Sequence, residues 1–186
     1  NINAFGKMAM AGCGAYSKIE GFGFIPVTCF SQALTTFIGQ NLGAKEYDRA
    51  KKGALFGTIC GIGIAEVIGI AVFFFSPYLI AAFGGDQKAI EYGIAEAHTI
   101  ALFYCLLAFS HCMAAIQRGA GRSIVPMFVM MLVWCGVRVT YISIVIRIIP
   151  VINVIYWAYP LTWFISSVIF LILFLKTDWI HGLEKQ

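Results

Sequence analysis

The sequence predicts an all-α fold, a polytopic bundle of five transmembrane helices. The first observation is its composition: 60% of the residues are hydrophobic, 12% are charged, and the mean hydropathy is +0.85. Soluble domains are about 45–50% apolar and about 25% charged, so most of this surface needs lipid as its solvent. The second is that 186 residues divide into five long apolar runs, each of the roughly 20 residues that a spanning helix requires.

The first helix is expected over residues 4–38 and is too long for one straight span. At 1.5 Å per residue it reaches about 50 Å, against a hydrocarbon core of about 30 Å. Pro26 should kink it, because proline removes one backbone hydrogen bond and clashes with the preceding turn.

The second helix is expected over residues 46–76, ending before Pro77. Small residues recur on it at every fourth position, which places them on one face. They are Gly53, Gly57, Gly61, Ala65 and Gly69. Such a stripe lets another helix approach closely, and it is interpreted as a packing surface.

The remaining three helices are expected over residues 92–117, 124–149 and 151–175. A glycine-rich turn at 83–86 precedes the first of them, and Pro150 separates the last two. The three lengths suit single spans.

Basic residues are distributed unevenly between the two ends of this arrangement. Eight lie on the face that holds the segment Gly39–Gly53, the 118–122 connection and the tail: Lys45, Arg49, Lys51, Lys52, Arg118, Arg122, Lys176 and Lys185. Three lie on the other face: Lys7, Lys88 and Arg147. Short loops rich in Lys and Arg stay in the cytoplasm, so segment 39–53 and the C-terminus are predicted to be cytoplasmic in a plasma (inner) membrane protein.

This orientation carries an expectation about length. Five spans with a cytoplasmic C-terminus place Asn1 outside, yet no signal peptide precedes it. We therefore expect at least one upstream helix, with residues 1–186 as a single transmembrane domain of a larger protein.

Ionisable side chains inside spans cost about 2.5–3.5 kcal/mol on insertion scales and are functional candidates by default. Glu20, Glu66 and Glu96 are the candidates for coupling to a cation or proton. For Glu66 the alternatives are an ion pair with Arg138, an exchangeable-cation site, or exposure to a water-filled cleft. For Glu20 the alternative is a local pair with Lys18.

Other polar side chains are candidates to line a cleft. On the first helix, Gln32 and Thr35 share a face with Ser31 and Thr36, which fits either interhelical hydrogen bonding or an aqueous passage. Arg138 has Trp134 one turn before it and Tyr141 three residues after, a spacing that suits cation–π stacking. His98 is a further cleft candidate, and its two-residue separation from Glu96 prevents the two from chelating one ion.

No motif for cofactor or catalytic chemistry is present. GAGRS at 119–123 lacks the length and the lysine of a phosphate-binding loop, and the six cysteines have no metal-ligand spacing. The net charge of +4 is too small and dispersed to predict a nucleic-acid partner. We expect no metal, no cofactor and no enzymatic activity.

With the spans placed, several motifs resemble the multidrug and toxic compound extrusion (MATE) family. These are GAYSKIEGFGFIPVTCFSQALTTFIGQNLGAKEYDRAKKG (14–53), QRGAGRSIVP (117–126), WCGVRVTYI (134–142) and YWAYPLTWFISSVIFLILFLKTDW (156–179). The most specific is GQNLGAKEYDRAKK, which contains Gly39, Gln40, Asn41, Gly43 and Arg49 and is interpreted as a turn followed by a basic helix start.

This resemblance implies a secondary antiporter of two six-helix lobes that alternate access around a central cleft. Such proteins export cationic, amphipathic drugs in exchange for Na⁺ or H⁺. The chain resembles the C-terminal lobe without its first helix, so its partners are expected to be the lipid bilayer, the missing N-terminal lobe and small organic cations. Glu20, near the Pro26 kink, is then the expected lever between cation binding and helix bending.

Two other functions remain open from the sequence. A lipid-linked oligosaccharide flippase of related fold needs a more basic cleft than Lys18 and Arg138 provide. An intramembrane enzyme with His98 or His111 as base lacks a nucleophile at a matching helical spacing.

Overall fold

The protein is represented by a computed structural model that describes residues 2–180, and this range contains helices and no strand. The elements are η1 (Ile2–Phe5), α1 (Lys7–Gly43), α2 (Tyr47–Ala81), α3 (Gln87–Ile100), η2 (Ala101–Phe103), α4 (Tyr104–Gly119), α5 (Ile124–Met130), η3 (Met131–Val137), α6 (Arg138–Ile148) and α7 (Asn153–Lys176). They form five helical segments that are long and apolar enough to cross a membrane: 7–43, 47–81, 87–119, 124–148 and 153–176. The predicted all-α bundle of five spans is confirmed.

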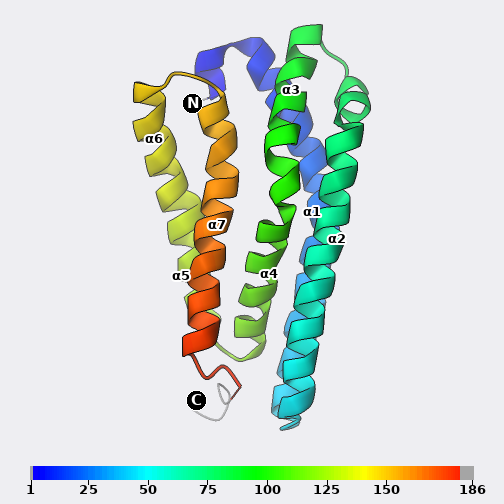
Figure 1. Cartoon of the computed structure of the whole chain (residues 1–186), viewed down its shortest axis with the longest axis vertical. Coiled ribbons are helices and arrows are strands. Elements are labelled where there is room, and N and C mark those ends of the chain that lie inside the picture. Colours follow the sequence, from blue (N-terminus) through cyan, green and yellow to red (C-terminus); the bar gives the residue numbers. More distant parts are fainter. Residues whose placement is uncertain (1, 181–186) are drawn as a thin grey trace.

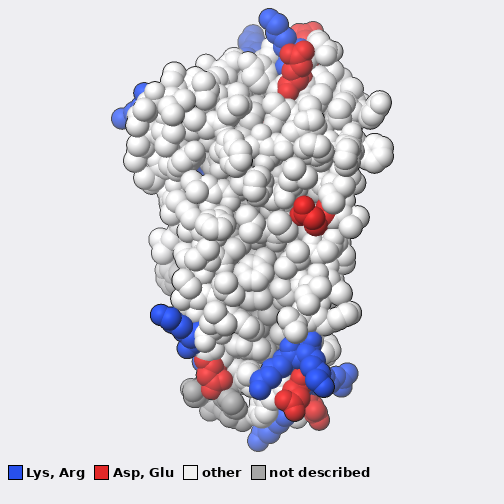
Figure 2. Space-filling model, viewed as in Figure 1, with Lys and Arg blue, Asp and Glu red and all other residues white. Residues whose placement is uncertain are grey.

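The five spans run side by side along the long axis of the molecule (Figure 1). The connections at 44–46 and 120–123 and the C-terminal end lie at one end, and the N-terminus lies at the other. On the face in Figure 2, charged atoms gather at both ends, and the belt between them is largely uncharged apart from an acidic group over α2. Of the eight basic residues predicted for one face, all but Lys185 are within the described residues.

The segment predicted as a Gly-Gln-Asn-Leu-Gly turn is instead the end of α1, which continues to Gly43. The Asn41 side chain donates to the carbonyl of Phe37, one turn earlier in the same helix, at 2.7 Å. The true connection is only Ala44–Glu46, closed by a hydrogen bond from the Glu46 amide to the Asn41 carbonyl at 2.8 Å. Lys45 takes the left-handed conformation there, with φ of 61°.

The prediction that the second helix ends before Pro77 is wrong, since α2 continues to Ala81. Proline at 77 leaves the carbonyl of Phe73, one turn earlier, without its helical donor. That carbonyl accepts from Ser76 Oγ at 3.2 Å and from His98 Nε2 at 3.1 Å. With the freed group satisfied by side chains, the helix passes through the proline.

The third and fourth spans contain irregular turns that the sequence did not reveal. The third begins at Gln87, earlier than predicted, and η2 interrupts it between α3 and α4. The fourth contains a π-helical segment, η3, between α5 and α6. Of the two, η3 contributes Trp134 to the candidate site described below.

The small-residue stripe on α2 is a packing surface, as predicted. Ala65 is fully buried, and a methyl group on Gly61 would press on the sulfur of Cys112 in α4. A methyl group on Gly69 would overlap the carbonyl oxygen of Ala101 in η2. These glycines therefore set how closely α2 approaches the third span.

We expect Gly69→Ala to destabilise the protein, because the clash is with backbone and requires the helices to separate. The expected loss is about 1–3 kcal/mol, which lowers the melting temperature by several degrees in a thermal unfolding experiment in detergent. Gly63→Ala on the same helix is the matched control, since nothing lies within 4 Å of that position. Equal melting temperatures for the two variants would contradict close packing at Gly69.

Candidate functional site

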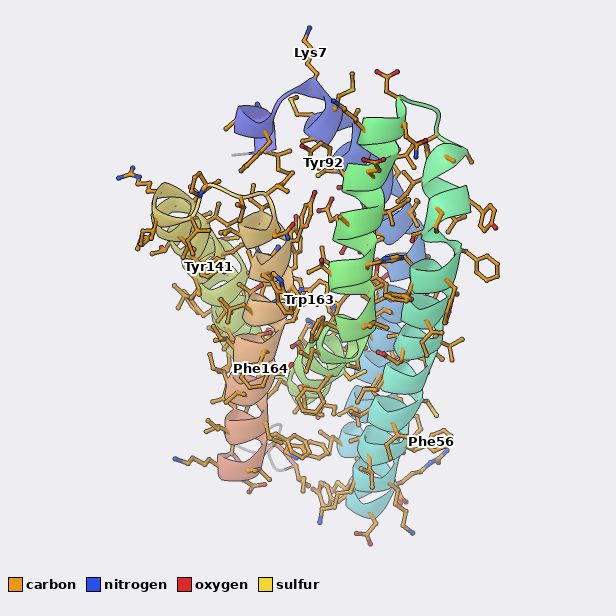
Figure 3. The ribbon with its side chains drawn as sticks, turned by 45° about the horizontal axis from the view of Figure 1, so that its top comes forward. Lys7, Phe56, Tyr92, Tyr141, Trp163 and Phe164 are labelled. Carbon is orange, nitrogen blue, oxygen red and sulfur yellow. The ribbon has the colours of Figure 1, made fainter. Side chains whose placement is uncertain are left out.

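A polar cavity of about 250 Å³ lies between α1, α4, the fourth span and α7. It is lined by Ser17, Glu20, Gly21, Phe24, Leu107, Trp134, Arg138, Tyr159 and Trp163. Two residues of opposite charge, Glu20 from α1 and Arg138 from the start of α6, contribute to it, and four aromatic rings form much of the remaining wall. Trp163 lies on the side of α7 toward the third span, where its ring meets Tyr104 (Figure 3).

The guanidinium of Arg138 is held by residues of α7. Its Nη2 and Nε donate to Thr162 Oγ1 at 2.8 and 3.3 Å, and its Cζ lies 4.2 Å from the centroid of the Tyr159 ring. The predicted contact with Trp134 is present at 5.9 Å. Hydrogen bonds and ring contacts therefore fix the cation at the cavity wall.

The prediction that Tyr141 stacks on the guanidinium of Arg138 is wrong. Tyr141 lies on α6 and lines a separate pocket with Gly136 and Thr140 (Figure 3). In the π-helical turn η3, which precedes α6, hydrogen bonds run from i to i+5. Spacing based on 3.6 residues per turn no longer identifies which side chains share a face there. The ring that contacts the Arg138 guanidinium in place of Tyr141 is that of Tyr159 on α7.

Glu20 faces Arg138 across the cavity, and the two charges attract each other. Their nitrogen and oxygen atoms form no ion pair within 4.0 Å. Lys18, the alternative partner considered for Glu20, instead places its ammonium 5.4 Å from the ring centroid of Phe83. Glu20 is thus directed into the cavity and toward the fourth span.

A second carboxylate, Glu96 on α3, is buried deeper beside the same helix. Its exposed fraction is 3%, and its Oε2 has no hydrogen-bond partner among the described residues. Cys13 lies close enough to interact with this carboxylate. The Tyr156 hydroxyl contacts the sulfur of Cys13 at 3.7 Å and donates to the Tyr92 carbonyl at 3.2 Å. A buried carboxylate oxygen without a donor is costly.

Two other candidates have structural roles outside the cavity. Glu66 Oε2 accepts from the amide of Cys105 at 3.1 Å, at the start of α4 where the preceding 3₁₀ turn leaves helical donors unpaired. The alternative of an ion pair with Arg138 is therefore wrong. His98 is exposed, stacks on Phe73 with a centroid separation of 4.4 Å, and donates to that residue's carbonyl.

The polar row on α1 is divided between different surroundings. Gln32 is exposed, and the Thr35 hydroxyl donates to the Ser31 carbonyl of its own helix at 3.0 Å. Ser31 is buried and accepts from Arg118 Nη2 at 3.2 Å. Neither Gln32 nor Thr35 lines the cavity of Glu20 and Arg138.

The residues of the 39–53 motif act at the end of the bundle rather than in the cavity. Gly39 faces the carbonyl of Gly119, where a methyl group would lie at 3.4 Å. Arg49 lies 6.0 Å from the ring centroid of Phe37. The motif therefore joins α1, α2 and α4 at the basic end.

Sequence reasoning missed Tyr159, Thr162, Cys13 and Tyr156. These side chains are uncharged at neutral pH, so a search for charged groups and histidines in apolar spans passes over them. A signal was present for two of them, because Tyr159 and Thr162 are three residues apart on one face around Pro160. Nothing in the sequence paired that face with Arg138.

The fold and the cavity define a polytopic all-α membrane protein with a polar site between its spans. The chain belongs to the MatE family, whose model matches residues 2–144. It is 28% identical over 128 residues to the probable multidrug resistance protein NorM of Thermotoga maritima, covering 66% of this chain and 28% of that protein. It is 24% identical over 142 residues to the probable multidrug resistance protein YoeA of Bacillus subtilis, covering 74% and 30%.

A solved structure described as the MATE transporter ClbM in complex with Rb⁺ has the same fold. It superimposes with a TM-score of 0.85 at 17% sequence identity, over 95% of this chain and 42% of that one. The chain spans about 30% of the length of the two curated relatives. These findings confirm the family resemblance and the membrane fold.

We expect Arg138→Gln to destabilise the protein by about 1–3 kcal/mol. The substitution removes the guanidinium that donates to the Thr162 hydroxyl and that attracts the Glu20 carboxylate. The double variant with Glu20→Gln should lose less than the sum of the two single losses, with a coupling of about 1 kcal/mol. A double-mutant cycle of unfolding in detergent measures this coupling. Arg147→Gln, an exposed arginine of the same span, is the control and should show no coupling with Glu20→Gln. Strict additivity for Glu20 and Arg138 would contradict the attraction.

Proposed function

We propose that the complete protein is a secondary antiporter that exports cationic or amphipathic drugs in exchange for Na⁺ or H⁺ by alternating access. Membership of the MatE family and two relatives named as probable multidrug resistance proteins support transport. The observation that carries the exchange is two carboxylates beside one another in the bundle: Glu20, half-buried at the cavity, and Glu96, buried with one oxygen unpartnered among the described residues. Such an oxygen is suited to an exchangeable proton or cation.

The coupling mechanism follows from the position of Glu20. Its attraction to Arg138 connects α1 with the fourth span, and Arg138 is anchored in turn to Thr162 of α7. A proton or Na⁺ on Glu20 cancels this attraction and loosens α1 from the other two helices. Pro26 lies six residues further along α1, less than two turns away, where a bend costs least. Cation binding thereby shifts the balance between two arrangements of the lobe.

The cavity wall suits an organic cation better than an anion. Phe24, Trp134, Tyr159 and Trp163 present aromatic rings, and ring faces attract ammonium groups. Glu20 adds a negative charge, although Arg138 opposes it. Release of Arg138 from Glu20 would leave the carboxylate to pair with the exported cation.

Glu20→Gln and Glu96→Gln in the complete protein should each lower gradient-driven efflux by about tenfold, as expected for loss of a coupling of 1–3 kcal/mol. Ethidium efflux from proteoliposomes, with Na⁺ and pH gradients imposed separately, measures the effect and identifies the coupling ion. Glu66→Gln is the matched control, because that carboxylate binds the Cys105 amide outside the cavity. An equal loss in the control, or full efflux by both test variants at equal amounts of reconstituted protein, would reject the coupling assignment.

We also propose that segment 39–53 and the C-terminus face the cytoplasm. The basic end of the described chain carries seven Lys and Arg residues, against three at the opposite end. In a cysteine-depleted background, Lys45→Cys should react with an impermeant maleimide only after the cells are permeabilised. Lys88→Cys, at the other end, should react in intact cells. The reverse labelling pattern would overturn the orientation.

A further inference from the structure

An apolar groove of about 510 Å³ lies apart from the polar cavity, between α2, α4, α7 and residues 177–180. Its lining is Lys51, Ala54, Leu55, Thr58, Phe109, Met113, Ile116, Leu171, Phe174, Leu175, Trp179 and Ile180. None of these residues is acidic. The Thr58 hydroxyl already donates to the Ala54 carbonyl at 2.8 Å. Among the described residues, Lys51 is the one charged group in the lining.

The groove has a polar end and an apolar end. The α2 residues that line it are at positions 51, 54, 55 and 58, which share one helix face and span about 10 Å along the axis. Lys51 lies at the aqueous end of this face, and Thr58 lies toward the membrane interior. The indole of Trp179 stacks on Phe174 near the same aqueous end, with centroids 5.4 Å apart.

The groove opens toward lipid along its length, since Leu55 and Leu175 in its walls are 66% and 74% exposed. Its aqueous end lies in the most basic part of the molecule. The described residues there are basic at Lys45, Arg49, Lys51, Lys52, Arg118, Arg122 and Lys176 and acidic at Glu46, Asp48 and Asp178. On the face in Figure 2, basic and acidic side chains gather at that end of the molecule.

We propose that this groove is a binding site for a glycerophospholipid with an anionic headgroup. One acyl chain lies along the apolar walls of α2, α4 and α7, and the phosphate is held by the ammonium of Lys51. A cationic drug is disfavoured here, because Lys51 repels it and the lining within residues 2–180 contains no carboxylate to offset the repulsion. The proposal rests on the groove and its charge, and it is independent of the transport function and of which leaflet the basic end faces.

The test is native mass spectrometry of the complete, delipidated protein titrated with dioleoyl phosphatidylglycerol or dioleoyl phosphatidylcholine, which share acyl chains and differ in net charge. Phosphatidylglycerol should bind more tightly. Lys51→Gln should weaken its binding about fivefold, the effect of one basic residue near an anionic lipid. Lys52→Gln, the neighbouring lysine outside the lining, should leave the affinity within twofold.

A second pair of variants tests the acyl-chain part of the site. Leu55→Trp adds bulk to an exposed wall of the groove and should abolish tight binding of phosphatidylglycerol. Ile59→Trp, equally exposed on α2 but outside the lining, should have no effect. Equal affinity for the two lipids, equal losses in the two lysine variants, or unchanged binding by Leu55→Trp would each overturn the proposal. These outcomes are independent of ethidium efflux, so neither proposal decides the other.

Discussion

Helices that are surrounded by lipid gain little hydrophobic free energy by packing against one another, because lipid tails are as apolar as leucine. The bundle therefore depends on close van der Waals contact, which requires small residues where backbones approach. Gly69 of α2 lies against the Ala101 carbonyl, and Gly12 of α1 lies against the Ala89 carbonyl and the Gly93 amide. Gly119 of α4 is placed in the same way against the Thr35 carbonyl. The central helices α1, α2, α3 and α4 are positioned by these contacts.

The same solvent requires every backbone polar group to find a partner inside the protein. Two ionisable side chains serve this purpose: His98 donates to the carbonyl freed by Pro77, and Glu66 accepts from the first-turn amide of Cys105. Their presence in the spans therefore has a structural explanation. Glu20 and Glu96 have no comparable backbone partner in the described residues, which sets them apart as candidates for exchange chemistry.

The π-helical turn of the fourth span shapes one wall of the cavity. The π-helical segment η3 ends at Val137, directly before Arg138. The Arg138 side chain contacts Thr162 and Tyr159 of α7 and faces Glu20 of α1 across the cavity. The sequence predicts one regular helix over 124–149, because the segment is mostly apolar and its only proline, Pro126, lies in the first turn. The predicted ring contact between Arg138 and Trp134 is present, whereas the predicted contact with Tyr141 is absent from the described residues.

Much of the fold was accessible from the sequence, because a five-span bundle requires only apolar runs of sufficient length and breaks between them. The stripe from Gly53 to Gly69 likewise identified a packing face through its four-residue period. The helix ends were less accessible, since His98 supports the continuation of α2 past Pro77 through a hydrogen bond from another helix, which no local pattern specifies.

The sequence by itself determined the number of spans, their relative sidedness and the set of ionisable residues that lipid makes costly. Only the tertiary structure decided which of those residues meet, separating Glu20 and Arg138 in one cavity from Glu66 and His98 at backbone gaps. The physical reason is that burial of an ionisable group is a property of one residue and its segment, whereas satisfying that group depends on atoms supplied by other helices.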